Sequence, residues 1–257
     1  MGEDAMAGRT QEIDQQTRDD RRLREDLAAC YRLAARNGWD DLIYTHITAR
    51  LPGMPERYLI NRFGYSFAEI TASNLVTVDR TGAVVGDDAH PVSAAAFTLH
   101  HTIYRARSDV NCVIHLHTDA GIAVSALECG LLPLSQHALR FLHDAGYLAY
   151  EGLDLGPDEQ ERLAASLGRN KALFLRNHGV LTCGATIPEA YSLMHTLEKA
   201  CTIQLRVMAA SANLVVPTQD VAERTYAQLR DDDVPEGERE WPSLLRQLAR
   251  DDPGYLD

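Results

Sequence analysis

The amino-acid sequence predicts an α/β fold, on the strength of its length, its composition and its hydrophobic patterning. The 257 residues are enough for one large domain with a substantial core. Hydrophobic residues make up 45% of the chain and charged residues 24%, as in an ordinary globular protein. Segments with the apolar spacing of helices alternate with short runs rich in β-branched and aromatic residues.

Helices are predicted where apolar residues recur at helical spacing or where alanine is abundant. Ser93 and Thr186 each precede such a segment and are suitable N-caps, because their hydroxyl groups can accept from a free backbone N–H. Gly38 and Gly168 each follow one and are suitable C-caps. The helices are expected at 22–37, 94–107, 120–127, 159–167 and 187–212.

Strands are predicted in the short runs of β-branched and aromatic residues between these helices. Alternate residues of the first run are Ile43, Thr45, Ile47 and Ala49, which would share one face of a strand. The sequence Arg-Thr-Gly at 80–82 predicts a turn between two later strands. The strands are expected at 42–51, 58–62, 75–79, 83–85, 110–117 and 171–175, with the last continuing at 180–183.

Changes in composition divide the chain into three parts. Residues 1–21 have little apolar content and are expected to form a flexible N-terminal segment. Residues 22–212 contain the predicted helices and strands and form the domain. Residues 213–257 carry two prolines and an acidic stretch before an apolar helix from Trp241 to Leu248. We expect this C-terminal arm either to pack elsewhere, for instance on another subunit, or to be a solvated tail.

Charge and cysteine content exclude several classes of protein. The net charge of −12 makes nucleic acid and anionic membranes poor partners, so a small-molecule substrate is expected instead. No apolar run approaches the roughly 20 residues of a membrane-spanning helix. The polar N-terminus does not resemble a secretory signal, which favours a cytoplasmic protein. The five cysteines include no C-x-x-C pair, so a disulfide framework or cysteine zinc site is not expected.

The pattern most suggestive of chemistry is His115-Leu116-His117 at the end of an apolar strand. Residues two apart on a strand point to the same face, so both imidazoles can reach one metal ion. His178 follows a second apolar strand, in a turn closed by Gly179. Three histidines leave coordination positions open for water or substrate, as catalytic metals require. The sequence therefore predicts one divalent metal ion, zinc or Fe(II), held by these three histidines.

Two residues beside His178 are candidates for binding substrate. Arg176 and Asn177 can fix the backbone of the turn or anchor an anionic substrate. Asn177 can equally be a turn residue that tolerates unusual backbone dihedral angles. The sequence leaves both interpretations open.

Several longer segments resemble the class II aldolase/adducin family: GWDDLIYTHITAR, VNCVIHLHTDAGIAVSA, KALFLRNHGVLTCG and EAYSLMHTLEKACTIQL. The resemblance extends from about Arg22 to Met208. It implies a single α/β/α domain with a mainly antiparallel central sheet, and a homotetramer with metal sites near subunit interfaces. In the aldolases of this family the three histidines bind zinc, which acts as a Lewis acid on a carbonyl group.

The sequence departs from the sugar-phosphate aldolases of that family at its acid/base and phosphate-binding positions. Their catalytic glutamate corresponds here to Ala96, and two phosphate-binding serines correspond to Ala94 and Ala95. A Gly-Asn pair of their phosphate loop corresponds to Thr45-His46. The chain therefore resembles a bacterial adducin-like branch that lacks the catalytic glutamate and the phosphate-binding serines. The chemistry of a sugar-phosphate aldolase does not follow from the fold.

Other residues are then candidates for moving a proton or contacting substrate. His46 corresponds to a loop that faces the metal in the family, and Thr45 beside it is a candidate for substrate contact. His137 falls near a substrate-facing tyrosine of the aldolases, which makes it a second catalytic candidate. Further acidic candidates are Glu69, Asp119 and Glu151.

Three functions are consistent with these residues. The favoured one is a metal-dependent carbon–carbon lyase, of the aldolase or decarboxylase type, acting on a small non-phosphorylated oxo or hydroxy acid. An alternative is a non-heme iron oxygenase that acts on an aromatic oxo acid through a three-histidine site. The apolar residues 94–96 would suit an aromatic or apolar substrate. The third is a non-catalytic, adducin-like interaction module.

Overall fold

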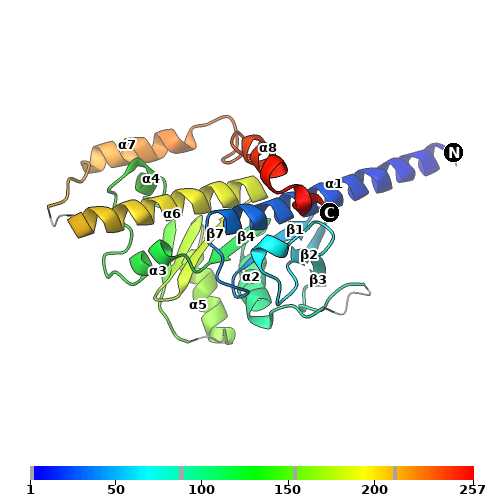
Figure 1. Cartoon of the computed structure of the whole chain (residues 1–257), viewed down its shortest axis with the longest axis horizontal. Coiled ribbons are helices and arrows are strands. Elements are labelled where there is room, and N and C mark those ends of the chain that lie inside the picture. Colours follow the sequence, from blue (N-terminus) through cyan, green and yellow to red (C-terminus); the bar gives the residue numbers. More distant parts are fainter. Residues whose placement is uncertain (1–2, 87–89, 153–154, 211–212) are drawn as a thin grey trace.

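A seven-stranded mixed sheet, in the order β3-β2-β1-β4-β7-β6-β5, organises the chain (Figure 1). The computed structural model describes residues 3–86, 90–152, 155–210 and 213–257, with side chains from residue 15 onward. The strands are β1 (His46–Leu51), β2 (Met54–Ile60), β3 (Val76–Asp79), β4 (Cys112–Leu116), β5 (Ala145–Leu148), β6 (Ala172–Leu175) and β7 (Gly179–Gly184). Neighbouring strands are antiparallel except β5 and β6, which confirms the expected mainly antiparallel sheet.

Helices cover both faces of this sheet. They are α1 (Glu3–Arg36), α2 (Ala94–Ala106), α3 (Asp119–Ser125), α4 (Gln136–Leu139), α5 (Pro157–Leu167), α6 (Ile187–Ala210), α7 (Gln219–Arg230) and α8 (Trp241–Asp251), with 3-10 turns η1 (Phe67–Glu69) and η2 (Pro253–Leu256). One buried cluster joins α1, α3, α6 and α8 to the sheet, and a second joins α2 and α5 to its other face. The chain therefore forms a single α/β/α domain, as expected.

The alternation of side chains along β4 decides where its histidine points. Cys112, Ile114 and Leu116 belong to the cluster beneath α1 and α6. Val113 belongs to the opposite cluster, beneath α2 and α5. Because successive residues of a strand point to opposite faces, His115 shares the face of Val113. The histidine motif is thus directed toward the layer formed by α2 and α5.

Most predicted elements are present, and the differences lie at their ends. Helix α2 begins after Ser93, whose Oγ accepts from the Ala96 N–H as an N-cap. The run predicted at 42–51 becomes a strand only from His46. The strand predicted at 83–85 is reduced to a single bridge between Val78 and Val84. The segment 180–183 does not continue the preceding strand: β7 folds back antiparallel to β6 as a hairpin. Residues 211–212 of the last predicted domain helix lie outside the described residues.

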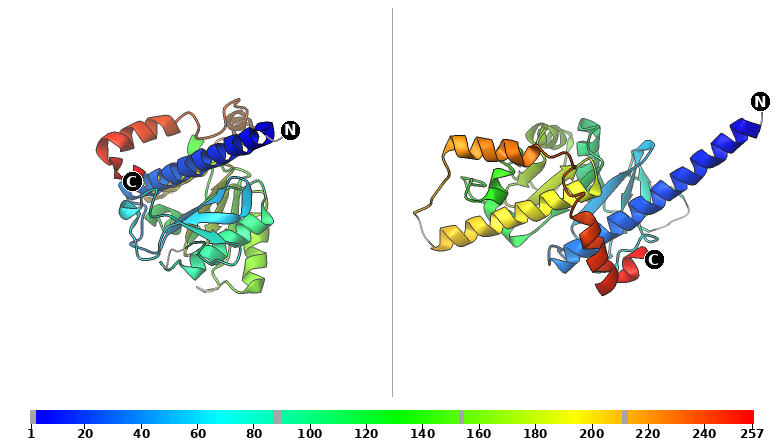
Figure 2. Two further views of the ribbon diagram at one scale, coloured as in Figure 1. Left: turned by 90° about the vertical axis from the view of Figure 1, so that its right-hand side faces the viewer. Right: turned by 90° about the horizontal axis from the view of Figure 1, so that it is seen from above.

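The N-terminal helix begins earlier than its apolar pattern indicates. Helix α1 starts at Glu3 rather than near Arg22, and its first turns project beyond the sheet (Figure 2). Polar residues dominate this projecting part, so it has the charge pattern of a solvated helix and no apolar face for a periodicity argument to detect. The flexibility expected of residues 1–21 stays a prediction.

The C-terminal arm contacts the same chain. The Trp241 indole N–H donates to the Asp26 carboxylate of α1 at 2.8 Å. Arg32 of α1 pairs with Asp252 at 3.0 Å. The Ala72 N–H donates to the carbonyl of Tyr255 at 2.9 Å, and the Tyr255 ring is buried. Residues 241–257 are therefore bound to α1 and the η1 region; a contact with another subunit stays a prediction.

Across the described residues, no helix combines the length and hydrophobicity that a membrane crossing requires.

Candidate metal centre

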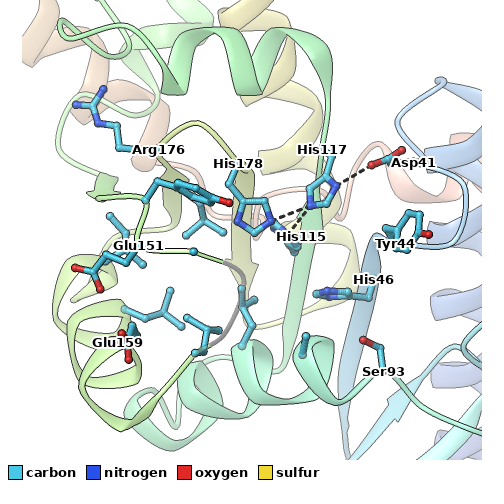
Figure 3. A pocket seen from close by; sticks show the side chains of 18 of the residues that line it. Asp41, Tyr44, His46, Ser93, His115, His117, Glu151, Glu159, Arg176 and His178 are labelled. Carbon is cyan, nitrogen blue, oxygen red and sulfur yellow. Dashed lines mark hydrogen bonds and ion pairs between the residues drawn. The ribbon is translucent and has the colours of Figure 1, made fainter.

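Three neighbouring chain segments bring the predicted metal-binding histidines together. His115 lies within β4, opposite His46 of β1 on one side and Leu181 of β7 on the other. His117 follows the end of β4, and His178 lies in the tight turn between β6 and β7. Figure 3 shows the three imidazole rings directed toward one point. The Nε2 atoms are 3.1 Å apart for His115 and His117 and 3.0 Å apart for His117 and His178.

The backbone of the β6–β7 turn is adapted to this arrangement. Asn177 has a φ of 58°, in the left-handed region that asparagine tolerates better than most residues, so its interpretation as a turn residue is confirmed. A Cβ on Gly179 would lie 2.6 Å from the Leu116 carbonyl oxygen and about 3 Å from the rings of His115 and His117. The absence of a side chain at Gly179 therefore lets the turn bring His178 against the other two histidines.

Partners outside the cluster fix which nitrogen carries hydrogen in two of the three rings, His115 and His117. Nδ1 of His115 lies 3.1 Å from the carbonyl oxygen of Val180, which can only accept, so Nδ1 is the donor. Nδ1 of His117 lies 2.9 Å from the carboxylate of Asp41 and donates to it by the same reasoning (Figure 3). When a ring with hydrogen on Nδ1 is in its metal-binding form, its Nε2 atom carries the lone pair. In that form the two Nε2 atoms face each other at 3.1 Å with no hydrogen between them.

Converging lone pairs repel one another unless a cation lies between them, and the distances fit that role. A tetrahedral zinc ion with Zn–N bonds of about 2.0–2.1 Å separates its nitrogen ligands by about 3.3 Å. The Nε2 separations of 3.0–3.1 Å are close to this value. The carboxylate of Asp41 behind His117 is the kind of partner that orients metal-bound histidines. The three residues therefore fit a divalent metal ion.

Burial keeps His115 and His178 in the neutral form that binds metals. Burial is the main cause that lowers the pKa of His115 well below its usual value, and the neighbouring histidines add to it. Burial followed by the charge of His117 lowers the pKa of His178 to about 4. At neutral pH the metal therefore does not have to displace protons from these two ligands.

His46, predicted as catalytic, lies beside the cluster. Its ring centroid is 5.1 Å from that of His115. Its Nδ1 is bonded to Nε2 of His100 at 2.9 Å, and His100 continues through Nδ1 to the hydroxyl of Thr48 at 2.5 Å. The Thr48 hydroxyl then meets the Tyr104 hydroxyl at 2.8 Å. These hydrogen bonds fix the His46 ring, and its Nε2 takes no part in them. His46 lines the same cavity as the three clustered histidines.

The histidines open onto a cavity of about 390 Å³ between α2 and α5. Its charged lining residues are Asp41, Glu151, Glu159 and Arg176. In Figure 3 the histidines border one side, and side chains without polar atoms fill the space between Glu159 and Ser93. The apolar lining includes Ala95, Leu99, Leu148, Leu155, Leu163 and Leu175.

Helix α2 supplies no ionisable group to this cavity. Its lining residues from the start of the helix are Ser93, Ala95 and Leu99. Ala96, which corresponds in sequence to the aldolase glutamate, is fully buried beneath the helix. Proton transfer at the centre therefore has to come from a residue of another element or from water.

The predicted substrate-binding residues occupy structural positions. Arg176 reaches the edge of the cavity, but its Nη1 donates to the carbonyls of Ser125 and Leu127 at the end of α3. The Asn177 backbone N–H donates to Ser125 Oγ, and its side chain does not line the cavity. Thr45 is buried outside the cavity, and its hydroxyl has no hydrogen-bond partner among the described residues.

The remaining candidates are spread over the molecule. His137 is exposed on α4 and lines a different cavity, with Arg140 and Glu236. Glu69 accepts from the backbone N–H and the hydroxyl of Ser66 as a capping residue. Asp119 lies in the first turn of α3. Of these residues only Glu151 borders the metal cavity, and its carboxylate is paired with Arg162.

Asp41 is the functional residue that the sequence analysis missed. It lies in the loop before β1, far along the chain from His117, and an aspartate in a loop carries no periodic signal. The available signal was its place in GWDDLIYTHITAR, one of the segments that resembles the family.

Comparison with known proteins agrees with this fold. Residues 25–205 match the model of the Class II Aldolase and Adducin N-terminal domain. A protein from Pseudomonas aeruginosa, which is named provisionally as a class 2 aldolase, is 47% identical to this chain. The match covers 90% of this chain and 91% of that protein. Mouse alpha-adducin is 45% identical over 76% of this chain, which corresponds to 27% of the adducin.

A solved structure extends the agreement to the whole fold. The crystal structure of an aldolase II superfamily protein from Pseudomonas syringae superposes with a TM-score of 0.90 and 44% identity. The superposition covers 93% of this chain and 96% of that protein. The matched residues 25–205 contain β1, β4, β7 and all three clustered histidines. The chain belongs to the class II aldolase and adducin family.

Proposed function

We propose that the chain is a metal-dependent carbon–carbon lyase, of the aldolase or decarboxylase type, acting on a small non-phosphorylated oxo or hydroxy acid. Family membership and the aldolase name of a close relative support an enzyme of the lyase type. The observation that carries the proposal is the convergence of three imidazole nitrogens, two of which, in His115 and His117, have outer partners that leave the Nε2 lone pair directed at the common point.

Each residue of the centre has a defined part in this chemistry. His115, His117 and His178 would hold the metal through Nε2, with Asp41 keeping His117 in the required tautomer. When bound, the metal supplies Lewis acidity toward a substrate carbonyl or carboxylate. In an aldol cleavage, Nε2 of His46 would accept the hydroxyl proton that leaves as the carbon–carbon bond breaks, and that proton would return to the product carbon. A decarboxylation releases no proton, so the product carbon would then be protonated by water. Burial lowers the pKa of His46 and keeps the ring neutral, as a proton acceptor must be. His100 holds the His46 ring through its bond to Nδ1.

The charges around the cavity support a substrate without phosphate. Arg176 is the one cation among the described lining residues, and its Nη1 is committed to two backbone carbonyls. Asp41, Glu151 and Glu159 contribute three carboxylates. Two of these carboxylates lie beside Arg162, so what disfavours a phosphate dianion is that the one lining guanidinium already has its Nη1 bonded to the protein.

A second candidate is a non-heme iron oxygenase acting on an aromatic oxo acid. The all-histidine ligand set, without a carboxylate from α2, supports it because such a set can hold Fe(II) with positions left for O₂ and a chelating substrate. The non-catalytic, adducin-like module is a third candidate, supported by the similarity to alpha-adducin.

The experiment that separates these functions starts with protein purified anaerobically without chelators. Elemental analysis gives the metal, and oxygen uptake is followed after Fe(II) and aromatic oxo acids are added. Stoichiometric zinc without oxygen uptake, and release of an aldehyde or CO₂ from oxo or hydroxy acids, is the result expected of the lyase. Substrate-dependent oxygen uptake would favour the oxygenase, and failure to retain any metal would favour the binding module.

We also propose a homotetramer with metal sites near subunit interfaces, as the family resemblance implies. His137 is exposed on α4, so a neighbouring subunit could receive it at such an interface. Light scattering during size-exclusion chromatography should give a mass of four chains. A monomeric mass would remove both the assembly and the role of His137.

A further inference from the structure

The cavity of the metal centre has two chemically different ends. One end carries the histidine nitrogens and His46, and the other is formed by aliphatic side chains. Helix α2 contributes Ala95 and Leu99, which lie one turn apart on the same face. Helix α5 contributes Leu163, which is fully buried, and β6 contributes Leu175. The apolar end is therefore built from two helices that cover the same face of the sheet and from a strand of that sheet.

The charged residues near the apolar end are neutralised by partners. The carboxylate of Glu151 pairs with Arg162 at 2.5 Å, and Glu159 lies 3.5 Å from the same guanidinium. Arg176 is bound to the carbonyls at the end of α3 and its guanidinium lies over the Tyr147 ring at 4.5 Å. A ligand group at this end therefore meets aliphatic surface without a charge that needs a counter-ion.

The size of the cavity exceeds what a two- or three-carbon oxo acid fills. Small-molecule sites range from about 300 to 1,000 Å³, and the cavity of about 390 Å³ falls within that range. Ala95 faces the cavity with the smallest side chain that still has a Cβ, which keeps a space open beside Leu99 and Leu163. A ring-sized apolar group that binds there is removed from water. This burial should raise the affinity of the ligand by about tenfold or more.

We infer that the end of the cavity formed by Ala95, Leu99, Leu155 and Leu163 binds an uncharged, ring-sized apolar substituent of the substrate. The polar head of the same molecule is an oxo or hydroxy acid at the histidines. The inference rests on the proposed function, since it takes the metal centre as the site of the polar head. It adds that the substrate is aromatic or bulky aliphatic.

Binding of two probes to zinc-loaded protein tests this assignment without an assay of activity. Pyruvate and phenylpyruvate share the same oxo-acid head and differ by one phenyl ring. Isothermal titration should give phenylpyruvate an affinity at least about tenfold higher than that of pyruvate. The His178→Ala variant, which lacks a metal ligand, should lose both.

Filling the apolar end should remove the difference in affinity between the two probes. Ala95→Phe places a ring in the pocket and should weaken phenylpyruvate about tenfold while leaving pyruvate within about twofold. Ala94→Phe is the matched control, because Ala94 is equally exposed on the same turn and does not line the cavity. It should leave both affinities unchanged.

The outcomes distinguish this inference from the proposed function. Pyruvate binding with phenylpyruvate no tighter, or equal effects of Ala95→Phe and Ala94→Phe, would overturn the apolar pocket and leave the metal-dependent function standing. Binding of neither probe by zinc-loaded protein would overturn the proposed function together with the pocket. Circular dichroism of the Ala95→Phe and Ala94→Phe variants verifies that they are folded.

Discussion

Two groups of buried histidines lie side by side, and they differ in the direction of their hydrogen bonds. In the His115, His117 and His178 cluster the Nδ1 atoms of the first two bond outward, to Val180 and Asp41. Their Nε2 atoms converge without a donor. His46 and His100 are bonded to each other, and His100 continues to Thr48.

The proximity of several histidines therefore does not by itself identify a metal site. His46, His100 and His115 are all buried, and all three have lowered pKa values for the same main reason, desolvation. The two groups of histidines differ in whether the ring nitrogens that face the other histidines have a hydrogen-bond partner within the group. A set of lone pairs without a donor calls for a cation, whereas a closed chain of donors and acceptors holds a side chain in place.

The largest effect is expected from removing any one of the three converging histidines. Replacing His115, His117 or His178 with Ala should abolish stoichiometric metal uptake, because two imidazoles hold a divalent ion far more weakly than three. Elemental analysis after dialysis measures the metal retained. His143→Ala, at an exposed histidine paired with Glu223, is the control that should keep it. Retention of one metal ion per chain in all three variants would refute the site.

The second prediction concerns His46 and His100, which form a hydrogen-bonded pair. His100→Ala leaves Nδ1 of His46 and the hydroxyl of Thr48 without their partner and opens a cavity, so it should cost about 2–4 kcal/mol of unfolding free energy. It should not reduce metal stoichiometry. Urea unfolding measures the cost. His101→Ala, at the partly exposed neighbour, should cost less, and loss of metal in His100→Ala would show that the two groups are not separate.

The third prediction tests whether Asp41 orients the His117 ring for metal binding. Asp41→Asn should weaken metal binding by about tenfold to a hundredfold, because an amide is a poorer acceptor for the His117 N–H than a carboxylate. Competition with a chelator of known affinity measures the change. Asp40→Asn removes the same charge from the adjacent, exposed position and is the matched control. An equal loss in both variants would assign the effect to overall charge rather than to orientation.

The last prediction concerns the pH dependence contributed by the hydrogen-bonded pair His46 and His100. Burial holds the pKa values of His46 and His100 well below 6.5, so the folded state stays neutral while the unfolded state gains protons below pH 6.5. Stability should therefore fall as the pH falls from 6.5 toward 5. Each histidine contributes at most about 1.4 kcal/mol per pH unit. Urea titrations of chelator-treated protein measure the slope, which His100→Gln should flatten; an unchanged slope would contradict the assignment.

The fold and the clustering of the three histidines could be predicted from the sequence because both leave local patterns. Alternation along β4 and the i, i+2 spacing placed His115 and His117 on one face, and Gly179 indicated the turn that presents His178. His46 was predicted from the family resemblance and lies at the centre.

What the sequence did not predict depends on contacts between distant segments. Asp41 acts through a bond to a residue 76 positions away, and nothing in its own neighbourhood indicates that partner. Arg176 was a candidate for substrate, but its role depends on where α3 ends in space. The projecting half of α1 has no apolar face, so periodicity could not reveal it.

The attachment of α8 and η2 to α1 has a consequence for the order of events during synthesis. Arg32 and its partner Asp252 are 220 residues apart, and Trp241 and Tyr255 cover the same helix. At about 5–20 residues per second, a ribosome needs roughly 10–45 s to add the second partner after the first. Through that interval the part of α1 that they later bury is exposed on the nascent chain, where a chaperone can bind it.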